Sequence, residues 1–311
     1  MASDLTSMNI DDNDVIVFVI ADFAPRLPEY TDRMRSYCDE LDRHKPKYDV
    51  MLLQGVKPEA ESFVRTVFSE CSWHTSPNIT RDGFFNMTGV NKEFTMWERS
   101  EIAMIGDPDG DGPITKEVEF APDCLVDLFE FNGNKVRVYN YEALKGPLFE
   151  IQRSFCTGLI TRDAYRYLQK SKDDDVMVYL GGDLHADSDF ESVRLLTGKM
   201  TKHGTYPSAF IDVWPALHRN SPDKGYTERE TDVFDSTVKL PRLIQPHRHT
   251  YFMVYGDAFG RVGTPLSCEI SGNSITRSGI PYSDDYGLDM EVWLPESRGF
   301  ITDEKRRGLF F

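Results

Sequence analysis

The sequence predicts an α/β fold with two packed, mixed β-sheets and helices outside them. Apolar runs of strand length recur along the chain, and amphipathic patterns of helical period lie between some of them. The stretch 130–140 carries Asn132-Gly133 between two such runs, and Asn-Gly is the strongest short-range signal for a hairpin. Hairpins and strand–helix–strand crossovers in one chain give sheets with both antiparallel and parallel neighbours.

The expected elements follow the hydrophobic pattern. Strands are expected at 15–21, 49–54, 100–105, 124–131, 135–140, 176–180, 250–255 and 288–294. Helices are expected at 29–44, 57–71, 161–171 and 189–198. Spacing of i, i+3, i+4 and i+7 gives the first helix one apolar face, made by Met34, Tyr37, Cys38 and Leu41.

The chain is expected to form one main domain, because no linker rich in proline and glycine divides it. This domain spans 15–295, with an N-terminal extension at 1–14 and a C-terminal tail at 296–311. Irregular polar stretches at 106–117, 219–237 and 295–311 are expected to be loops or tails.

The composition is that of a folded, acidic protein. Hydrophobic residues make up 40% of the 311 residues and aromatic residues 12%, which is enough for a sizeable core. The formal net charge is -16, from 51 acidic and 35 basic residues. Proteins that grip phosphate backbones or anionic membranes rely on Lys and Arg, so neither nucleic acid nor an anionic membrane surface is the expected partner.

Compartment is inferred from three features of the sequence. No apolar run approaches the roughly 18–20 residues of a membrane span, and the stretch 1–14 has acids where a signal peptide has basic and apolar regions. The five cysteines are scattered without a C-x-x-C pair, which favours reduced, buried thiols. We therefore expect a soluble, intracellular, cytoplasmic protein without a transmembrane segment.

One strand ends in a candidate site. Residues 176–189, VMVYLGGDLHADSD, begin as a buried strand that is expected to break at Gly181-Gly182. Acid and imidazole groups follow in quick succession, at Asp183, His185, Asp187 and Asp189. Open sheets commonly deliver catalytic carboxylates to a cleft from such strand ends.

Four stretches, in this order, resemble motifs of the endonuclease/exonuclease/phosphatase superfamily, especially its neutral-sphingomyelinase-like branch. YDVMLLQGV (48–56) resembles the strand motif D-V-(apolar)-x-L-Q-E-V, and GGDLHADSD (181–189) resembles G-D-x-N. FIDVWPALHRNSPDKGYT (210–227) is similar to a segment with D-x-W, a short helix and a G-x-T turn. YSDDYGLDMEVWL (282–294) is similar to the closing S-D-H-(F/Y)-G motif and last strand. The resemblance covers nearly the whole chain and implies a four-layer α/β sandwich, the deoxyribonuclease-like fold.

The resemblance also implies Mg²⁺-dependent hydrolysis of phosphate esters by a metal-binding Glu and Asn, a water-orienting Asp and two histidines. Asp183 and Asp284 match aspartates of the family, and Asp212 matches a structural one. The sequence departs from the family at several functional positions. These are Gly55 for Glu, Ala21 (or Asp22 after a one-residue shift) for Asn, Glu142 for His, His185 for Asn, Thr250 for an acid and Asp285 for the final His.

These departures predict a degenerate site, because phosphoryl transfer needs cations around an anionic substrate. With His185 as the one possible cation, a phosphate would face four acids: Glu142, Asp183, Asp284 and Asp285. The expectation is a catalytically degenerate member of the fold that acts as a binding or structural module in a larger assembly, with protein partners and no cofactor.

The alternative is a Mg²⁺-dependent phosphodiesterase, sphingomyelinase-like or acting on another phosphoester, with a remodelled acidic metal site. Its candidate metal ligands are Asp22, Asp183, Asp284 and Asp285.

Three further stretches carry less specific patterns. Residues 107–119 begin like a Ca²⁺ loop, but Val118 stands where an EF-hand has its bidentate Glu. His247 and His249 alternate, so on a strand they would share a face, either chelating a metal or lying on the surface. The tail 303–311 ends in three apolar residues that either fray or dock into a partner. Partner binding is expected on 106–117, 219–237 and Leu309 to Phe311 rather than in the cleft.

Overall fold

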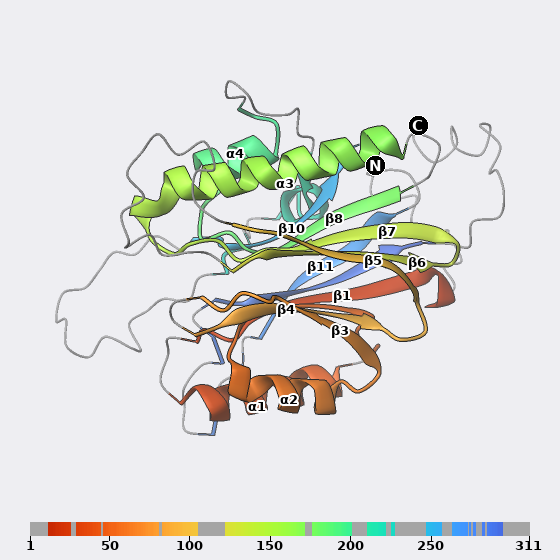
Figure 1. Ribbon diagram of the computed structural model, residues 1–311, viewed down its shortest axis with the longest axis vertical. Coiled ribbons are helices and arrows are strands. Elements are labelled where there is room, and N and C mark those ends of the chain that lie inside the picture. Colours follow the sequence, from red (N-terminus) through yellow and green to blue (C-terminus); the bar gives the residue numbers. More distant parts are fainter. Residues whose placement is uncertain are drawn as a thin grey trace.

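The expected fold class is confirmed by the computed structural model, in which two six-stranded mixed sheets are packed face to face between helices (Figure 1). Sheet A has the strand order β11-β12-β1-β2-β4-β3 and sheet B the order β5-β6-β7-β8-β10-β9. The structure describes residues 12–25, 29–44, 46–80, 83–104, 122–171, 176–200, 210–221, 225–227, 247–256, 263–272, 274, 276–277, 282–283 and 285–294.

The element bounds are as follows. Sheet A contains β1 (Val15–Asp22), β2 (Val50–Val56), β3 (Cys71–Thr75), β4 (Phe85–Asn91), β11 (Thr264–Ser271) and β12 (Gly287–Trp293). Sheet B contains β5 (Thr95–Ile102), β6 (Cys124–Phe131), β7 (Asn134–Asn140), β8 (Val176–Asp183), β9 (Phe210–Asp212) and β10 (Thr250–Tyr255). The helices are α1 (Tyr30–Arg43), α2 (Pro58–Val67), α3 (Glu150–Lys170), α4 (Glu191–Leu196) and α5 (Val213–Leu217), with short 3₁₀ turns η2 (Asp12–Asp14) and η3 (Pro147–Phe149).

Four layers and three cores follow from strands that are apolar on both faces. In β1, Phe18 and its alternate neighbours pack between the sheets, whereas Val17 and Val19 pack under α1 and α2. A third core lies between sheet B and helices α3 and α4. In Figure 1, α1 and α2 therefore cover the outer face of sheet A, and α3 and α4 cover that of sheet B.

The hairpin prediction is confirmed. Strands β6 and β7 pair antiparallel around Asn132 and Gly133, which both adopt positive φ, of 51° and 73°. Two successive residues with positive φ are the requirement of a type I′ turn, and Asn-Gly meets it at little steric cost. The prediction of buried thiols is also confirmed, since all five cysteines are buried and free.

Several expected elements need correction. Strands β3, β4, β9 and β11 were not expected, β5 lies at 95–102 rather than 100–105, and α3 begins at Glu150 rather than at 161. Strand β4 escapes the hydrophobic pattern because Asn86 and Thr88 are buried polar residues and Gly89 lies under the ring of Trp73. Strand β8 does not break at the glycine pair but continues to Asp183.

Some predictions fall outside the described residues. These are the calcium-like pattern at 107–119, most of 219–237, the 295–311 tail with Leu309 to Phe311, and Asp284. Within the part that the structure describes, no helix is long and apolar enough to cross a membrane.

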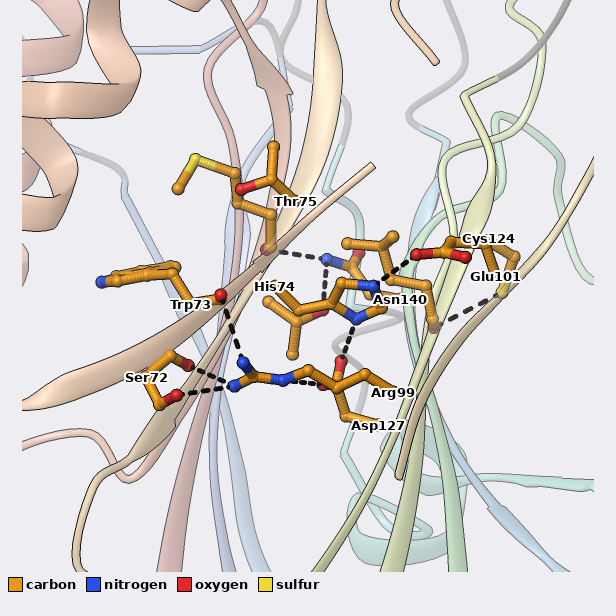
Figure 2. Close-up of polar contacts among 12 residues, drawn as sticks. Ser72, Trp73, His74, Thr75, Arg99, Glu101, Cys124, Asp127 and Asn140 are labelled. Carbon is orange, nitrogen blue, oxygen red and sulfur yellow. Dashed lines mark hydrogen bonds and ion pairs between the residues drawn. The ribbon is translucent and has the colours of Figure 1, made fainter. Parts of the chain in front are cut away.

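A polar network joins the edge strands of the two sheets. Figure 2 shows His74 of β3 between two carboxylates of sheet B, with Nδ1 3.1 Å from Asp127 Oδ2 and Nε2 2.8 Å from Glu101 Oε1. Arg99 of β5 donates to Asp127 Oδ1 at 3.2 Å and to the Ser72 carbonyl of β3 at 3.0 Å. Since Asp127 is fully buried, its charge depends on these two cations.

The His74 network predicts a pH-dependent contribution to stability. Burial opposes the imidazolium charge, but the hydrogen bonds and charges of Asp127 and Glu101 outweigh it, so the pKa of His74 is raised. A histidine whose pKa is higher in the folded than in the unfolded protein stabilises the fold when it is protonated. This contribution is complete below the unfolded-state pKa of about 6.5 and is lost as the pH rises through the folded-state pKa.

We therefore expect His74→Gln to lower the free energy of unfolding by about 1–3 kcal/mol near pH 5.5 and by less near pH 9. Urea unfolding of the wild type and the variant at both pH values measures the difference. An equal difference at both pH values would show that His74 is not charged in the folded protein.

Candidate functional site

The candidate site lies at the end of β8, where backbone packing is unusually close. Gly182 has φ +152°, and a Cβ at this position would lie 1.8 Å from the Tyr141 carbonyl oxygen. The close approach allows the segment after β7 to pair with the end of β8. In this pairing the Ala143 amide donates to the Asp183 carbonyl at 2.8 Å. Glycine is thus required here by sterics.

Four side chains from both sheets meet at this point and form what we call the cleft cluster. Each offers one ligand atom, and these atoms all lie within 4.8 Å of one another. Two members end or follow β8, one precedes β10, and one precedes β12 of sheet A. The members are Asp183, His185, His249 and Asp285.

The cleft cluster consists of two close acid–imidazole pairs. His185 Nδ1 lies 3.1 Å from Asp183 Oδ1, and His249 Nδ1 lies 3.4 Å from Asp285 Oδ1. The carboxylate side chains are fully buried, and the imidazoles are 6% and 13% exposed. His185 has a positive φ of 44°, and its own amide donates to Asp183 Oδ1 at 2.8 Å, which offsets part of the backbone strain.

The two carboxyl groups differ in acidity. Burial raises the pKa of Asp183 well above its usual range, and the nearby charges of Asp285 and Asp22 add to the rise. Burial also acts against ionised Asp285, but His249 and Lys145 outweigh it and bring the pKa to about 2. When two carboxyl groups lie close together, ionisation of one raises the pKa of the other. Of these two groups, Asp285 is therefore the ionised one.

A backbone turn positions the second pair. The hydroxyl of buried Thr227 accepts hydrogen bonds from the amides of His249 and Thr250, at 2.8 and 2.9 Å. Its carbonyl accepts from the Tyr286 amide at 2.7 Å. Thr227 belongs to the segment that resembles the G-x-T turn, and it holds the His249 segment against the Asp285 segment.

Gly55, which the resemblance places where the family has a metal-binding glutamate, leaves no room for a side chain. Gly55 has φ +65°, and a Cβ there would lie 2.6 Å from Pro25 Cδ and 2.7 Å from Asp22 Oδ1. Its amide donates to Glu142 Oε2 at 3.2 Å. Asp22 in turn accepts from the Ala24 amide at 3.0 Å and the Ser283 hydroxyl at 3.2 Å. Two other carboxylates thus surround the position that the resemblance gives to glutamate.

Three other residues singled out from the sequence, His247, Thr250 and Asp212, lie outside the cleft cluster. His247 is bonded to Asp187, and its neighbour His249 lies in the cleft cluster with a side chain 13% exposed. The structure therefore supports neither a metal site shared by both histidines nor a surface position without partners. Thr250 donates to the Tyr286 carbonyl at 2.9 Å, a structural contact. Asp212 pairs with Arg248, which agrees with the structural role implied for it.

Sequence reasoning missed two basic side chains at this site. His185 was the only one expected, but His249 and Lys145 also face the acids, with Lys145 Nζ 3.9 Å from Asp285 Oδ2. Lys145 lies outside every motif, in the segment after β7, so its signal was only its closeness in sequence to Glu142.

Solved structures similar to this chain share its fold at low identity. D. rerio TDP2 humanized by 14 mutations gives a TM-score of 0.66 at 18% identity, over 90% of this chain and 99% of that one. An endonuclease/exonuclease/phosphatase from Bacteroides vulgatus gives 0.65 at 14%, over 90% and 99%. The human Nocturnin catalytic domain with bound sulfate gives 0.58 at 13%, over 90% and 94%. No family model and no curated protein matches the chain.

This chain has the endonuclease/exonuclease/phosphatase fold. The TM-scores of 0.66, 0.65 and 0.58 establish the fold, and the identities of 18%, 14% and 13% leave the activity open. The assignment to the sphingomyelinase-like branch and the degeneracy of the motifs remain predictions.

Among the described residues, which exclude Asp284, the side chains present do not fit the Mg²⁺ site that the resemblance implies. Mg²⁺ requires an octahedron made almost wholly of oxygen, whereas half of the cleft cluster is imidazole. The position of the metal-binding glutamate is closed by Asp22 and Pro25, and both Asp22 oxygens already accept hydrogen bonds.

Restoring the glutamate tests whether the surroundings have been rebuilt around glycine. We expect Gly55→Glu to lower the free energy of unfolding by about 2–5 kcal/mol, from positive φ and steric overlap together. The matched control is Gly83→Glu, which also has positive φ (+81°) but no atom within 4 Å of the added Cβ, and should cost about 1–2 kcal/mol. Urea unfolding compares the two. Equal losses would mean that the space at Gly55 is still open.

Proposed function

We propose that this chain is a catalytically degenerate member of its fold that acts as a binding or structural module, without Mg²⁺-dependent phosphoester hydrolysis. The observation that carries the proposal is the closed backbone at Gly55, where Asp22 and Pro25 leave no room for a side chain. A glutamate lost by simple substitution would leave a gap. Here the neighbouring carboxylates have taken other hydrogen-bond partners.

The electrostatics of the cleft support the same proposal. Asp285 is ionised and fully buried, and its charge is already compensated by His249 and Lys145. An incoming phosphate would have to displace these internal pairs and would meet the carboxylates of Asp183 and Glu142 nearby. Catalysis of phosphoryl transfer needs the opposite arrangement, with cations left available for the substrate.

The second candidate function is a metal-dependent phosphoester hydrolase. One observation favours it, because the cleft cluster is a compact set of acid and imidazole groups on a fold whose similar structures include a TDP2 complexed with a single-strand DNA product. The net charge of -16 weighs against a nucleic-acid substrate for this chain.

We expect no hydrolysis of bis(p-nitrophenyl) phosphate, sphingomyelin, phosphoinositides or single-stranded DNA above the Asp183→Asn background, with Mg²⁺, Mn²⁺ or Zn²⁺ present. Asp183→Asn keeps the size of the side chain and removes its charge, so it identifies turnover by a contaminating enzyme. Turnover in the wild type that the variant loses would establish the second candidate instead.

The binding role requires a separate measurement. A tagged full-length chain should enrich at least one protein in a pull-down read by mass spectrometry, relative to an unrelated acidic bait of the same size. Enrichment of nothing over that bait would contradict the proposed module.

A further inference from the structure

The cleft cluster has the donor chemistry of a transition-metal site. It combines two imidazole nitrogens with two carboxylates, a set that suits zinc and its neighbours far better than Mg²⁺ or Ca²⁺. Two carboxylates also balance the charge of one divalent ion when the imidazoles are neutral, and Lys145 lies beside them, 3.9 Å from Asp285 Oδ2.

The distances agree with four-fold coordination. Donor atoms bonded to a tetrahedral zinc at about 2.0–2.1 Å are about 3.3–3.4 Å from one another. In the cleft cluster the two acid–imidazole separations are 3.1 and 3.4 Å, and all four donors lie within 4.8 Å. Shortening the longer separations, which reach 4.8 Å, by up to about 1.4 Å would complete the tetrahedron.

A second observation points to a missing partner. Asp183 Oδ2 and His185 Nδ1 are buried and make no hydrogen bond in the described part of the chain, although His185 Nδ1 lies 3.1 Å from Asp183 Oδ1. Their side chains are 0% and 6% exposed. Buried polar atoms are nearly always satisfied, and a metal ion would satisfy both of these at once.

We propose that the cleft cluster binds one divalent transition-metal ion of the zinc class, as a closed structural site with four protein ligands. Structural zinc sites fill all four positions with side chains, whereas catalytic sites leave one for water or substrate. The ion ties the β8 and β10 ends of sheet B to the start of β12 in sheet A. This inference is independent of the proposed partner-binding role.

The test uses the full chain after chelator treatment and dialysis. We expect calorimetric titration with ZnCl₂ to give one equivalent of tight binding and MgCl₂ to give none, with a saturable zinc-dependent rise in melting temperature. Co²⁺ in the same site should show the intense visible absorption of tetrahedral cobalt. Absence of zinc binding by the wild type, or an octahedral cobalt spectrum, would overturn the proposal.

The variants locate the site. His249→Gln and His185→Gln should each weaken zinc binding at least tenfold, in protein whose circular dichroism is unchanged. The matched control is His247→Gln, a histidine of the same segment that pairs with Asp187 outside the cluster, and it should bind zinc as the wild type does. Zinc binding that survives both ligand variants would place the ion elsewhere and refute the assignment.

The outcome is separable from that of the proposed function. Zinc binding accompanied by phosphoester turnover would leave the metal site standing and remove the non-catalytic role. Protein that binds no zinc and hydrolyses no phosphoester would remove the metal site and leave the proposed non-catalytic role standing.

Discussion

The cleft cluster depends on hydrogen bonds that cross between the two sheets at Asn140. Asn140 is the last residue of β7 and is fully buried. Its side-chain Oδ1 accepts a hydrogen bond from Gln54 of β2 at 2.6 Å, and its Nδ2 donates to the Met87 carbonyl of β4 at 2.9 Å. Leaving such a buried group unpaired costs about 1–3 kcal/mol, so the sheets are held at one spacing and register here. That spacing is what lets Glu142, two residues further on, reach the amide of Gly55 on the opposite sheet.

The same constraint explains which parts of the fold could be predicted. Strands β1, β2 and β8 are apolar on both faces, so the hydrophobic pattern was sufficient to predict them. Asn132-Gly133 favours the type I′ turn, so the β6–β7 hairpin was also predictable from local sequence. Strand β4 was missed because its buried Asn86 and Thr88 belong to the polar contacts between the sheets. A polar residue that is buried by a partner far along the chain is indistinguishable, in sequence, from one in a loop.

For the site, motif resemblance identified the positions but not their contacts. Asp183, His185 and Asp285 were expected near one another and are. The contacts of His249 and Lys145 with Asp285 are not specified by local sequence, because they depend on how the segments before β10 and after β7 pass each other. Sequence alone identifies Gly55 as a missing side chain, and the structure adds that its positive φ and its closeness to Asp22 leave no room for one.

The position of β12 has a consequence for the synthesis of the chain. Strand β1 lies between β2 and β12 in sheet A, and all six of its registered antiparallel partners belong to residues 288–293. At about 5–20 residues per second, β1 waits roughly 15–60 s on the ribosome before its second neighbour exists. During that interval one edge of an almost wholly apolar strand is open to wrong pairing, so sheet A of this chain can close only late, when β12 is available.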